Sequence, residues 1–297
     1  MSKSTLKQKL ESGTFVLTAE ITPPLSADPN DMIERGKPLK GLADAVNVTD
    51  GASARAHLES TVAAHLLLQT GVEPILQLTC RDRNRIGLQS QMVGAAALGI
   101  TNMLALKGDD PKKGDQPDAK PVFDYDSSDL IATAVSIRDK HQLPHGRAVA
   151  GAAAFFLGAA DAPVDPKPDW KPTSLEKKIA AGAQFTQTQF CMDTAVLRRY
   201  TAALKAHGLL GKVYMIVGVA PLASPKQARF IKDNLFGSIV PDWIVARMDK
   251  ATDAKAEGID IAVDLINEMK TIEGVHGAHI MAPLNESAIP RVLHRMR

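Results

Sequence analysis

The sequence predicts an α/β fold, a single (β/α)8 TIM barrel of eight parallel strands and eight covering helices. Short apolar runs alternate with stretches of helical periodicity along the whole chain, as repeated strand and helix units require. The apolar runs show little polar alternation, which is typical of parallel strands buried on both faces. Their starts lie about 37 residues apart on average, close to the spacing that eight units impose on such a barrel.

Eight runs are expected to form the strands because each is short, apolar and bounded by residues that end regular structure. They are residues 15–21, 45–49, 74–80, 102–108, 148–155, 185–191, 213–219 and 275–281. The first must stop at Ile21 because Pro23 and Pro24 follow it, and proline interrupts both strands and helices. An open, doubly wound sheet fits less well, since no glycine-rich dinucleotide fingerprint follows the first strand.

Nine stretches with apolar residues at helical spacing are expected to form the helices. They are residues 31–42, 53–70, 88–98, 128–140, 174–181, 195–207, 226–235, 253–270 and 287–297. Four of them end at a glycine that suits a left-handed cap, at Gly71, Gly99, Gly182 and Gly208. The longest irregular stretches, 111–127 and 156–173, are expected to be loops over the functional face. The whole chain, 1–297, is expected to form one barrel domain.

Composition excludes several classes of function. With 297 residues, 45% of them hydrophobic, the chain can bury a large core, and its net charge of +2 provides no field for nucleic acid or an anionic membrane. The first seven residues lack the apolar stretch of a signal peptide, and no run is long enough to span a bilayer, so a cytoplasmic protein is expected. Cys80 and Cys191 are expected to be buried thiols, and no metal site is expected.

Polar side chains gather where the expected strands end. In a TIM barrel these ends share one face, and that face carries the functional site. The residues are Glu20, Thr49, Asp50, Gln77, Thr79, Cys80, 107–110, Gln187, Gln189 and Asn285. Among them, Glu20 follows an apolar run, where a carboxylate needs either an Arg or Lys partner or a role as a proton donor. Both interpretations of Glu20 are open at this point.

Six segments in a fixed order, nearly one for each strand, carry a resemblance. They are Ala19-Glu20-Ile21-Thr22-Pro23-Pro24, Val46-Asn47-Val48-Thr49-Asp50-Gly51-Ala52, Leu78-Thr79-Cys80, Leu104-Ala105-Leu106-Lys107-Gly108-Asp109, Lys177-Lys178-Ile179-Ala180-Ala181-Gly182-Ala183 and Thr188-Gln189-Phe190. Each segment alone is weakly specific, whereas their order is specific. Over nearly its whole length the sequence resembles the methylenetetrahydrofolate reductase family. The resemblance implies a barrel that holds FAD and passes a hydride from NADH or NADPH to methylenetetrahydrofolate.

The resemblance also implies roles for individual residues. Glu20 matches the general acid that protonates the folate, and Asp109 matches a carboxylate that tunes the flavin and approaches the folate. Gln189 matches a folate-binding amide, which can donate and accept hydrogen bonds at once. The matches to FAD-binding positions are Thr49, Lys107, Gly108, Asp109 and Lys178. Of these, Lys178 is expected at the pyrophosphate.

Three departures from the family pattern keep alternatives open. Gln77 stands where many relatives have a histidine, residues 151–158 replace the aromatic and histidine residues that hold FAD after the fifth strand, and Pro225 replaces a phenylalanine that stacks on nicotinamide. One alternative is a methyltransferase-like barrel that binds folate without flavin. Another is a subunit that receives electrons from a separate protein. The resemblance leaves open a homo-oligomer as well.

Overall fold

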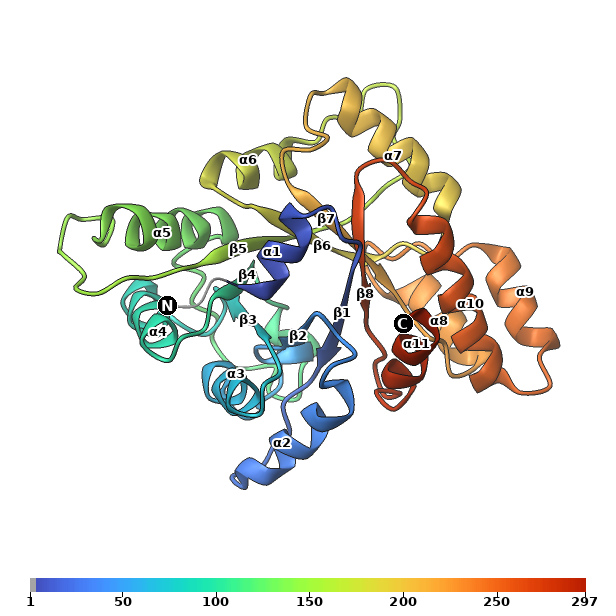
Figure 1. Cartoon of the computed structure of the whole chain (residues 1–297), viewed down its shortest axis with the longest axis horizontal. Coiled ribbons are helices and arrows are strands. Elements are labelled where there is room, and N and C mark those ends of the chain that lie inside the picture. Colours follow the sequence, from blue (N-terminus) through green and yellow to red (C-terminus); the bar gives the residue numbers. More distant parts are fainter. Residues whose placement is uncertain (1–3) are drawn as a thin grey trace.

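The computed structural model describes residues 4–297, and its eight strands close into one parallel barrel in chain order (Figure 1). The strands are β1 (Val16–Ile21), β2 (Ala45–Val48), β3 (Pro74–Thr79), β4 (Asn102–Leu106), β5 (Phe156–Asp161), β6 (Phe185–Phe190), β7 (Tyr214–Val219) and β8 (Val275–Ile280). Strands β1 and β8 pair with each other and complete the ring. The predicted (β/α)8 barrel is therefore confirmed.

Helices lie between successive strands and cover the outside of the barrel (Figure 1). They are α1 (Thr5–Glu11), α2 (Pro29–Gly36), α3 (Ser60–Gln69), α4 (Arg85–Ala97), α5 (Ser127–Lys140), α6 (Thr173–Ala181), α7 (Thr194–Ala206), α8 (Pro225–Asn234), α9 (Asp242–Lys250), α10 (Ala254–Met269) and α11 (Ala288–Met296). Short 3-10 turns are η1 (Lys37–Leu39), η2 (Ala52–Ala54) and η3 (Pro111–Lys113). Helices α1 and α9 were not predicted from the sequence. The four glycines expected to cap helices all have positive φ.

The predicted position of the fifth strand is wrong. Residues 148–155 form no strand, apart from an isolated bridge between Ala148 and Gln142, and β5 begins only at Phe156. The alanine and glycine run before Phe156 is apolar, but it has no bulky side chains to bury, and Ala152 and Ala154 remain exposed. The Phe156 ring instead stacks on Phe185 with the centroids 4.8 Å apart, which anchors β5 beside β6.

This shift changes which loops reach the functional face. The loop after β5 runs over residues 162–172 rather than 156–173, and residues 151–158 lie before or within the strand. The corrected segment after β5 contains no histidine, and its aromatic residue, Trp170, packs against Tyr200 and His207. The predicted loop at 111–127 does leave the carboxyl end of β4, on the face where β1 ends at Glu20 and Ile21. It contains the turn η3.

The barrel interior has an apolar layer at its amino-terminal end. Helix α1 lies across this end (Figure 1), and it buries Leu6 and Leu10 there. The other side chains of the layer come from the strands: Val16, Ala45, Ile75, Leu104, Phe156, Phe185 and Ile216. Because side chains alternate along a strand, the next inward positions form a second layer closer to the functional face. Its members include Thr18, Asn47, Gln187 and His279, all buried.

Two further predictions from composition can be compared with the structure. Cys80 and Cys191 are buried free thiols, as expected, and burial raises the pKa of each to about 12. Within residues 4–297 we find no helix that combines the length and the apolar character needed to cross a bilayer.

The packing of α1 leads to a stability prediction. Replacement of Leu10 by alanine should lower the free energy of unfolding by about 2–5 kcal/mol, because it opens a cavity in a layer that α1 fills. Leu25→Ala is the control, since Leu25 is 78% exposed and its replacement should change stability by less than about 0.5 kcal/mol. Denaturant unfolding monitored by circular dichroism measures both variants. Equal midpoints for Leu10→Ala and the wild type would show that α1 does not close the barrel in solution.

Candidate active site

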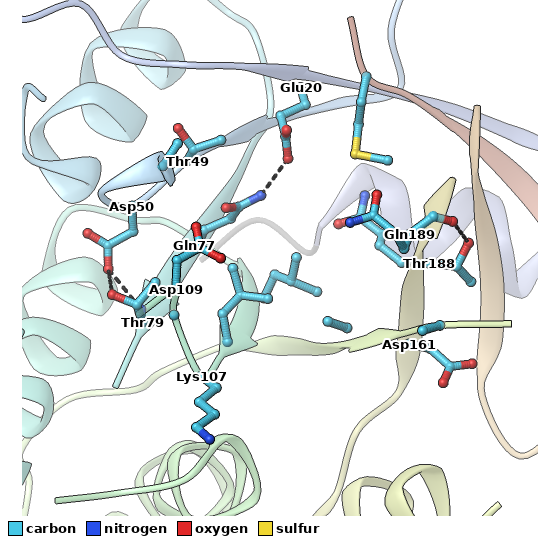
Figure 2. Close-up of a pocket in the computed structure, with 18 of the residues that line it drawn as sticks. Glu20, Thr49, Asp50, Gln77, Thr79, Lys107, Asp109, Asp161, Thr188 and Gln189 are labelled. Carbon is cyan, nitrogen blue, oxygen red and sulfur yellow. Dashed lines mark hydrogen bonds between the residues drawn. The ribbon is translucent and has the colours of Figure 1, made fainter. Parts of the chain in front are cut away.

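A cavity of about 650 Å³ opens at the carboxyl ends of the strands (Figure 2). Its wall is formed by strand ends and the loops that follow them, as in other TIM barrels. Every candidate site residue predicted from the sequence lines this cavity: Glu20, Thr49, Lys107, Gly108, Asp109, Lys178 and Gln189. Three other strand-end residues of the sequence analysis, Cys80, Asp110 and Asn285, are not among the lining residues. Asn285 instead donates to the carbonyl of Pro221 at 3.2 Å.

Glu20 lies near the end of β1 and has a side chain that is 24% exposed. The amide of Gln77 on β3 donates to its Oε2 at 2.8 Å, and His279 Nε2 on β8 lies 3.6 Å from the same oxygen (Figure 2). Among residues 4–297, no arginine or lysine forms an ion pair with Glu20. The interpretation of Glu20 as a structural partner of Arg or Lys is therefore not supported, and its carboxylate accepts a hydrogen bond from the Gln77 amide at the cavity wall.

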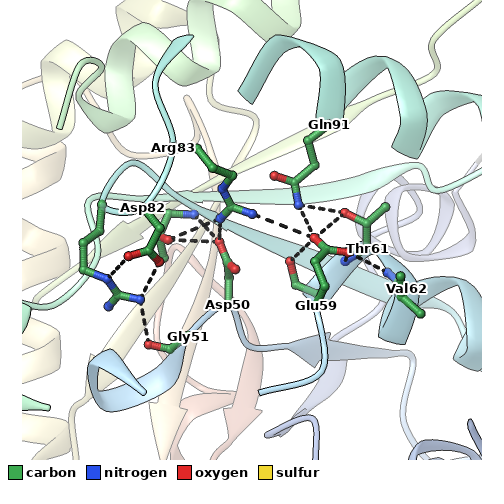
Figure 3. Close-up of polar contacts among 11 residues, drawn as sticks. Asp50, Gly51, Glu59, Thr61, Val62, Asp82, Arg83 and Gln91 are labelled. Carbon is green, nitrogen blue, oxygen red and sulfur yellow. Dashed lines mark hydrogen bonds and ion pairs between the residues drawn. The ribbon is translucent and has the colours of Figure 1, made fainter. Parts of the chain in front are cut away.

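Asp50 follows β2, and its contacts stabilise the loop that begins there (Figure 3). It accepts hydrogen bonds from the backbone N–H and hydroxyl of Thr79, at 2.8 and 2.9 Å, and forms an ion pair with Arg83. Arg83 also lies 3.8 Å from Glu59, which caps the first turn of α3. These contacts tie the β2 loop to β3, α3 and α4. Asp50 is paired with an arginine and bound to Thr79 through Oδ2, so its charge is neutralised and its main role is structural.

Arg81 is a lining residue that the sequence analysis did not identify. Its side chain is 4% exposed, and its guanidinium donates to Asp82 at 2.7 Å and to the carbonyl of Gly51 at 3.1 Å. The contact holds the turn after β2, where Ser53 and Ala54 adopt positive φ. Arg81 follows the strand-end residue Cys80 in sequence, and this position is the only local signal that could have pointed to it.

Gly108 follows β4 with a φ of +93°. An added Cβ would lie 2.9 Å from Cβ of Arg81 and 3.1 Å from that of Thr79, so both its conformation and its surroundings require glycine. Its neighbour Asp109 is exposed at the cavity. Lys107 points outward, with its ammonium 5.6 Å from the centre of the Phe123 ring. The β4 turn therefore places a carboxylate, but not the lysine charge, in the cavity (Figure 2).

Lys178 and Asp161 lie on the opposite wall. Lys178 on α6 donates to the carbonyl of Ala160 at 2.6 Å, and burial lowers its pKa. Asp161 at the end of β5 accepts a hydrogen bond from the Tyr200 hydroxyl at 2.7 Å, and burial raises the pKa of its carboxyl. The sequence analysis missed Asp161 because it placed the end of the fifth strand at residue 155.

Gln189 is the next-to-last residue of β6, and its amide oxygen already accepts a hydrogen bond within the chain. The backbone N–H of Phe190 donates to Oε1 at 3.0 Å, and this contact fixes the orientation of the amide. The amide nitrogen remains available as a donor toward the cavity. Thr49 Oγ1 on the β2 side is buried and has no hydrogen-bond partner within the described chain. Both groups are placed to receive a polar ligand.

Comparisons with known proteins give a consistent result. The family model described as methylenetetrahydrofolate reductase matches residues 5–297. The 5,10-methylenetetrahydrofolate reductase of Pectobacterium carotovorum is 26% identical over 284 residues, which cover 90% of this chain and 85% of the relative. The Escherichia coli enzyme of the same name is 26% identical over 220 residues, which cover 71% and 66% of the two chains.

Two more distant comparisons concern a longer relative and a solved structure. Methylenetetrahydrofolate reductase 2 of Saccharomyces cerevisiae is 27% identical over 244 residues, and the match covers 77% of this chain but only 37% of the yeast protein. An uncharacterized protein from Clostridium thermocellum, described as binding two copies of 5-methyl-5,6,7,8-tetrahydrofolic acid, has a TM-score of 0.69 at 15% identity and covers 98% of each chain. This likeness supports the fold.

The family match does not depend on one segment. It extends from residue 5 to residue 297 and therefore includes all eight strands of the barrel and every residue of the cavity wall. The chain belongs to the methylenetetrahydrofolate reductase family.

Proposed function

We propose that this chain catalyses the flavin-dependent interconversion of 5,10-methylenetetrahydrofolate and 5-methyltetrahydrofolate by hydride transfer. Its family consists of oxidoreductases of folate one-carbon metabolism. One observation carries the proposal beyond the family: Glu20 on β1, Asp109 in the turn after β4 and Gln189 on β6 line the same cavity. The structural neighbour that binds methyltetrahydrofolate on the same fold also supports a folate ligand.

Glu20 is proposed as the general acid. The methylene bridge of the folate opens when its leaving nitrogen receives a proton, and a carboxyl group at the cavity wall can supply it. The contacts described for Glu20 all involve Oε2, from Gln77 and His279. Oε1 therefore remains available to carry a proton to the ligand.

Gln189 and Asp109 are proposed to bind the pterin. The donor nitrogen of Gln189 suits a carbonyl or ring nitrogen, because its oxygen is already bound to the N–H of Phe190. The carboxylate of Asp109 accepts hydrogen bonds only, so it suits the amino and N–H groups of a pterin ring. Together the two side chains offer complementary donors and acceptors to one planar ligand.

The ring end of FAD fits the described cavity. Thr49, Gly108 and Asp109 lie along one side of it, and the buried Thr49 hydroxyl lacks a partner in the described chain, as expected for a position that meets a ligand. Lys107, whose ammonium lies over Phe123, and Lys178 on α6 complete the proposed FAD-binding residues. FAD, when bound, would carry the hydride between NADH or NADPH and the folate. The negative charge of Asp109 beside it would lower its reduction potential.

A second candidate function is a folate-binding barrel that works without flavin. One observation favours it: Lys178 is committed to the carbonyl of Ala160, and the buried carboxyl of Asp161 lies beside it. A pyrophosphate at this wall would meet a carboxyl group and one lysine whose ammonium is already used. The two candidates differ in a property that is measured directly, the binding of FAD.

FAD binding is the first prediction for the site. The purified protein should show a flavin absorbance spectrum, or gain thermal stability on addition of FAD, since a ligand at 100 times its Kd stabilises a protein by about 2.7 kcal/mol. Lys178→Ala should weaken FAD binding by about 10-fold or more, because one cation at the pyrophosphate is lost. Lys177→Ala is the matched control, since Lys177 is adjacent in sequence but pairs with Asp126. Protein that neither contains FAD nor responds to it supports the flavin-free candidate.

The second prediction distinguishes Glu20 from Asp109 by the half-reaction that each affects, reduction of the flavin or reduction of the folate. Glu20→Gln should leave reduction of the flavin by the donor nearly unchanged and slow folate turnover by about 100-fold, the scale for losing a general acid. Asp109→Asn should preserve or ease reduction by the donor and slow the folate step, because removal of the charge raises the flavin potential. Stopped-flow measurement of each half-reaction gives both rates.

Asp110→Asn is the control for the charge change. Asp110 is adjacent to Asp109, but its carboxylate accepts from the backbone N–H of Lys112 and is not part of the cavity wall. This variant should show wild-type rates in both half-reactions. Wild-type reduction of methylenetetrahydrofolate by Glu20→Gln would disprove the general-acid role.

A further inference from the structure

His279 lies inside the barrel, directly below the cavity. It comes from β8 and is 2% exposed, and it belongs to a polar layer that spans four strands. The other members of this layer are Thr18 on β1, Asn47 on β2 and Gln187 on β6. A polar layer in a barrel interior is costly unless each group finds a partner. The hydrogen bonds of this layer therefore indicate which nitrogen of His279 carries the proton.

Two groups approach Nδ1 of His279. The Thr18 hydroxyl lies at 2.9 Å and the amide nitrogen of Gln187 at 3.3 Å. The Gln187 amide nitrogen has two hydrogens: one bonds to Asn47, and the other lies between the Thr18 hydroxyl, at 3.2 Å, and Nδ1. A proton on Nδ1 would face that amide hydrogen at close range. Nδ1 is therefore an acceptor, and the ring proton of the imidazole lies on Nε2.

The Gln187 amide group is held in place by a second contact. Its amide forms a reciprocal pair with Asn47: Gln187 Nε2 donates to Asn47 Oδ1 at 3.0 Å, and Asn47 Nδ2 donates to Gln187 Oε1 at 2.6 Å. The pair bridges β2 and β6 across the barrel. It holds the amide group of Gln187 below the imidazole.

The Nε2–H group faces the proposed acid. Nε2 lies 3.6 Å from Oε2 of Glu20, and the same oxygen accepts from Gln77 at 2.8 Å. Strand pairing makes this approach possible: Thr18 lies opposite His279 on β1 and β8, and Glu20 is the next residue of β1 on the inward face. A contact of 3.6 Å is longer than a hydrogen bond, and catalytic hydrogen bonds commonly tighten when the ligand binds.

We propose that His279 is a positioning residue for Glu20: Thr18 and Gln187 fix its tautomer, and its Nε2–H together with Gln77 binds Oε2. In this arrangement Oε1 is the oxygen that holds the proton for the folate. Within the described chain, Oε1 has no hydrogen-bond donor of its own, so the proton is not drawn back into the protein. The inference rests on the proposed function, because it assigns a purpose to the orientation of the acid.

Two substitutions of His279 test the contacts of Nδ1 and the donor at Nε2 separately. His279→Asn places an amide oxygen near the position of Nδ1, so the contacts with Thr18 and Gln187 are kept while the donor to Glu20 is lost. His279→Gln places an amide nitrogen near the position of Nε2, so the donor to Glu20 is kept. We expect His279→Asn to lower kcat for methylenetetrahydrofolate by roughly 10-fold, less than loss of the acid itself, with little change in KM. His279→Gln should restore most of the rate.

A double-mutant cycle tests whether His279 acts through Glu20. If it does, His279→Asn should cause no further loss in the Glu20→Gln background, because the group that it positions is already disabled. Equal rates for His279→Asn and His279→Gln, or a full additional loss in the double variant, would overturn the inference. A wild-type rate for Glu20→Gln would remove the general-acid role on which the inference rests. A slow Glu20→Gln variant together with equal rates of the two His279 variants would overturn the positioning role alone, so the two failures are distinguished.

The wild-type protein offers an independent measurement if the variants do not fold. Nitrogen NMR of protein labelled with 15N-histidine reports the tautomer of each imidazole. The His279 signal is identified by its slow exchange with solvent, because His279 is the only buried histidine of the described residues. The inference requires a protonated Nε2 and an unprotonated Nδ1 at His279. A proton on Nδ1 would contradict it, since Nε2 would then have no hydrogen to donate to Glu20.

Discussion

The structure depends on one constraint, the need to satisfy a layer of polar side chains inside the barrel. Thr18, Asn47, Gln187 and His279 are all buried, and each is hydrogen-bonded to another member of the layer. An unpaired polar group at such a depth costs on the order of 1–3 kcal/mol, so the four strands must keep their register. The layer separates the apolar floor, closed by α1, from the ligand cavity. The side chains that satisfy the interior therefore also form the base of the site.

The rim of the cavity is held by a separate set of contacts. Asp50 and Arg83 join the β2 loop to β3 and α3, and Arg81 binds the carbonyl of Gly51 on the same loop. These groups carry charge, yet each is neutralised by a neighbour, so the rim adds little net charge around the ligand. Among the carboxylates of the cavity wall, Glu20 and Asp109 have neither an ion pair within residues 4–297, as Asp50 has, nor a bond to a tyrosine, as Asp161 has. Structural and chemical carboxylates are thus distinguished by their partners rather than by their positions, because both kinds stand at strand ends.

The structure shows what Gln77 does at a position where the sequence departs from the family pattern: its amide binds Glu20. At the position where the family resemblance leads us to expect a histidine, an amide from β3 binds Oε2 of Glu20, and the imidazole of His279 approaches the same oxygen from β8 at 3.6 Å. Both contacts of the Glu20 carboxylate are therefore on one oxygen. The departure after β5 has a different character. The corrected loop still lacks a histidine, and the half-buried Asp161 beside Lys178 occupies the wall where the phosphate end of FAD is expected.

The sequence by itself determined the barrel and the face that carries the site. Apolar runs at regular spacing predict parallel strands, and parallel strands bring their carboxyl ends together, so Glu20, Asp109 and Gln189 had to converge. The fifth strand was misplaced because alanine and glycine at 150–154 are apolar without bulk, and burial of Phe156 against Phe185 decides its start. Only the tertiary structure revealed Asp161, Arg81 and His279. His279 lies 261 residues from Thr18, and their contact exists only because β8 closes against β1, an event that no local pattern encodes.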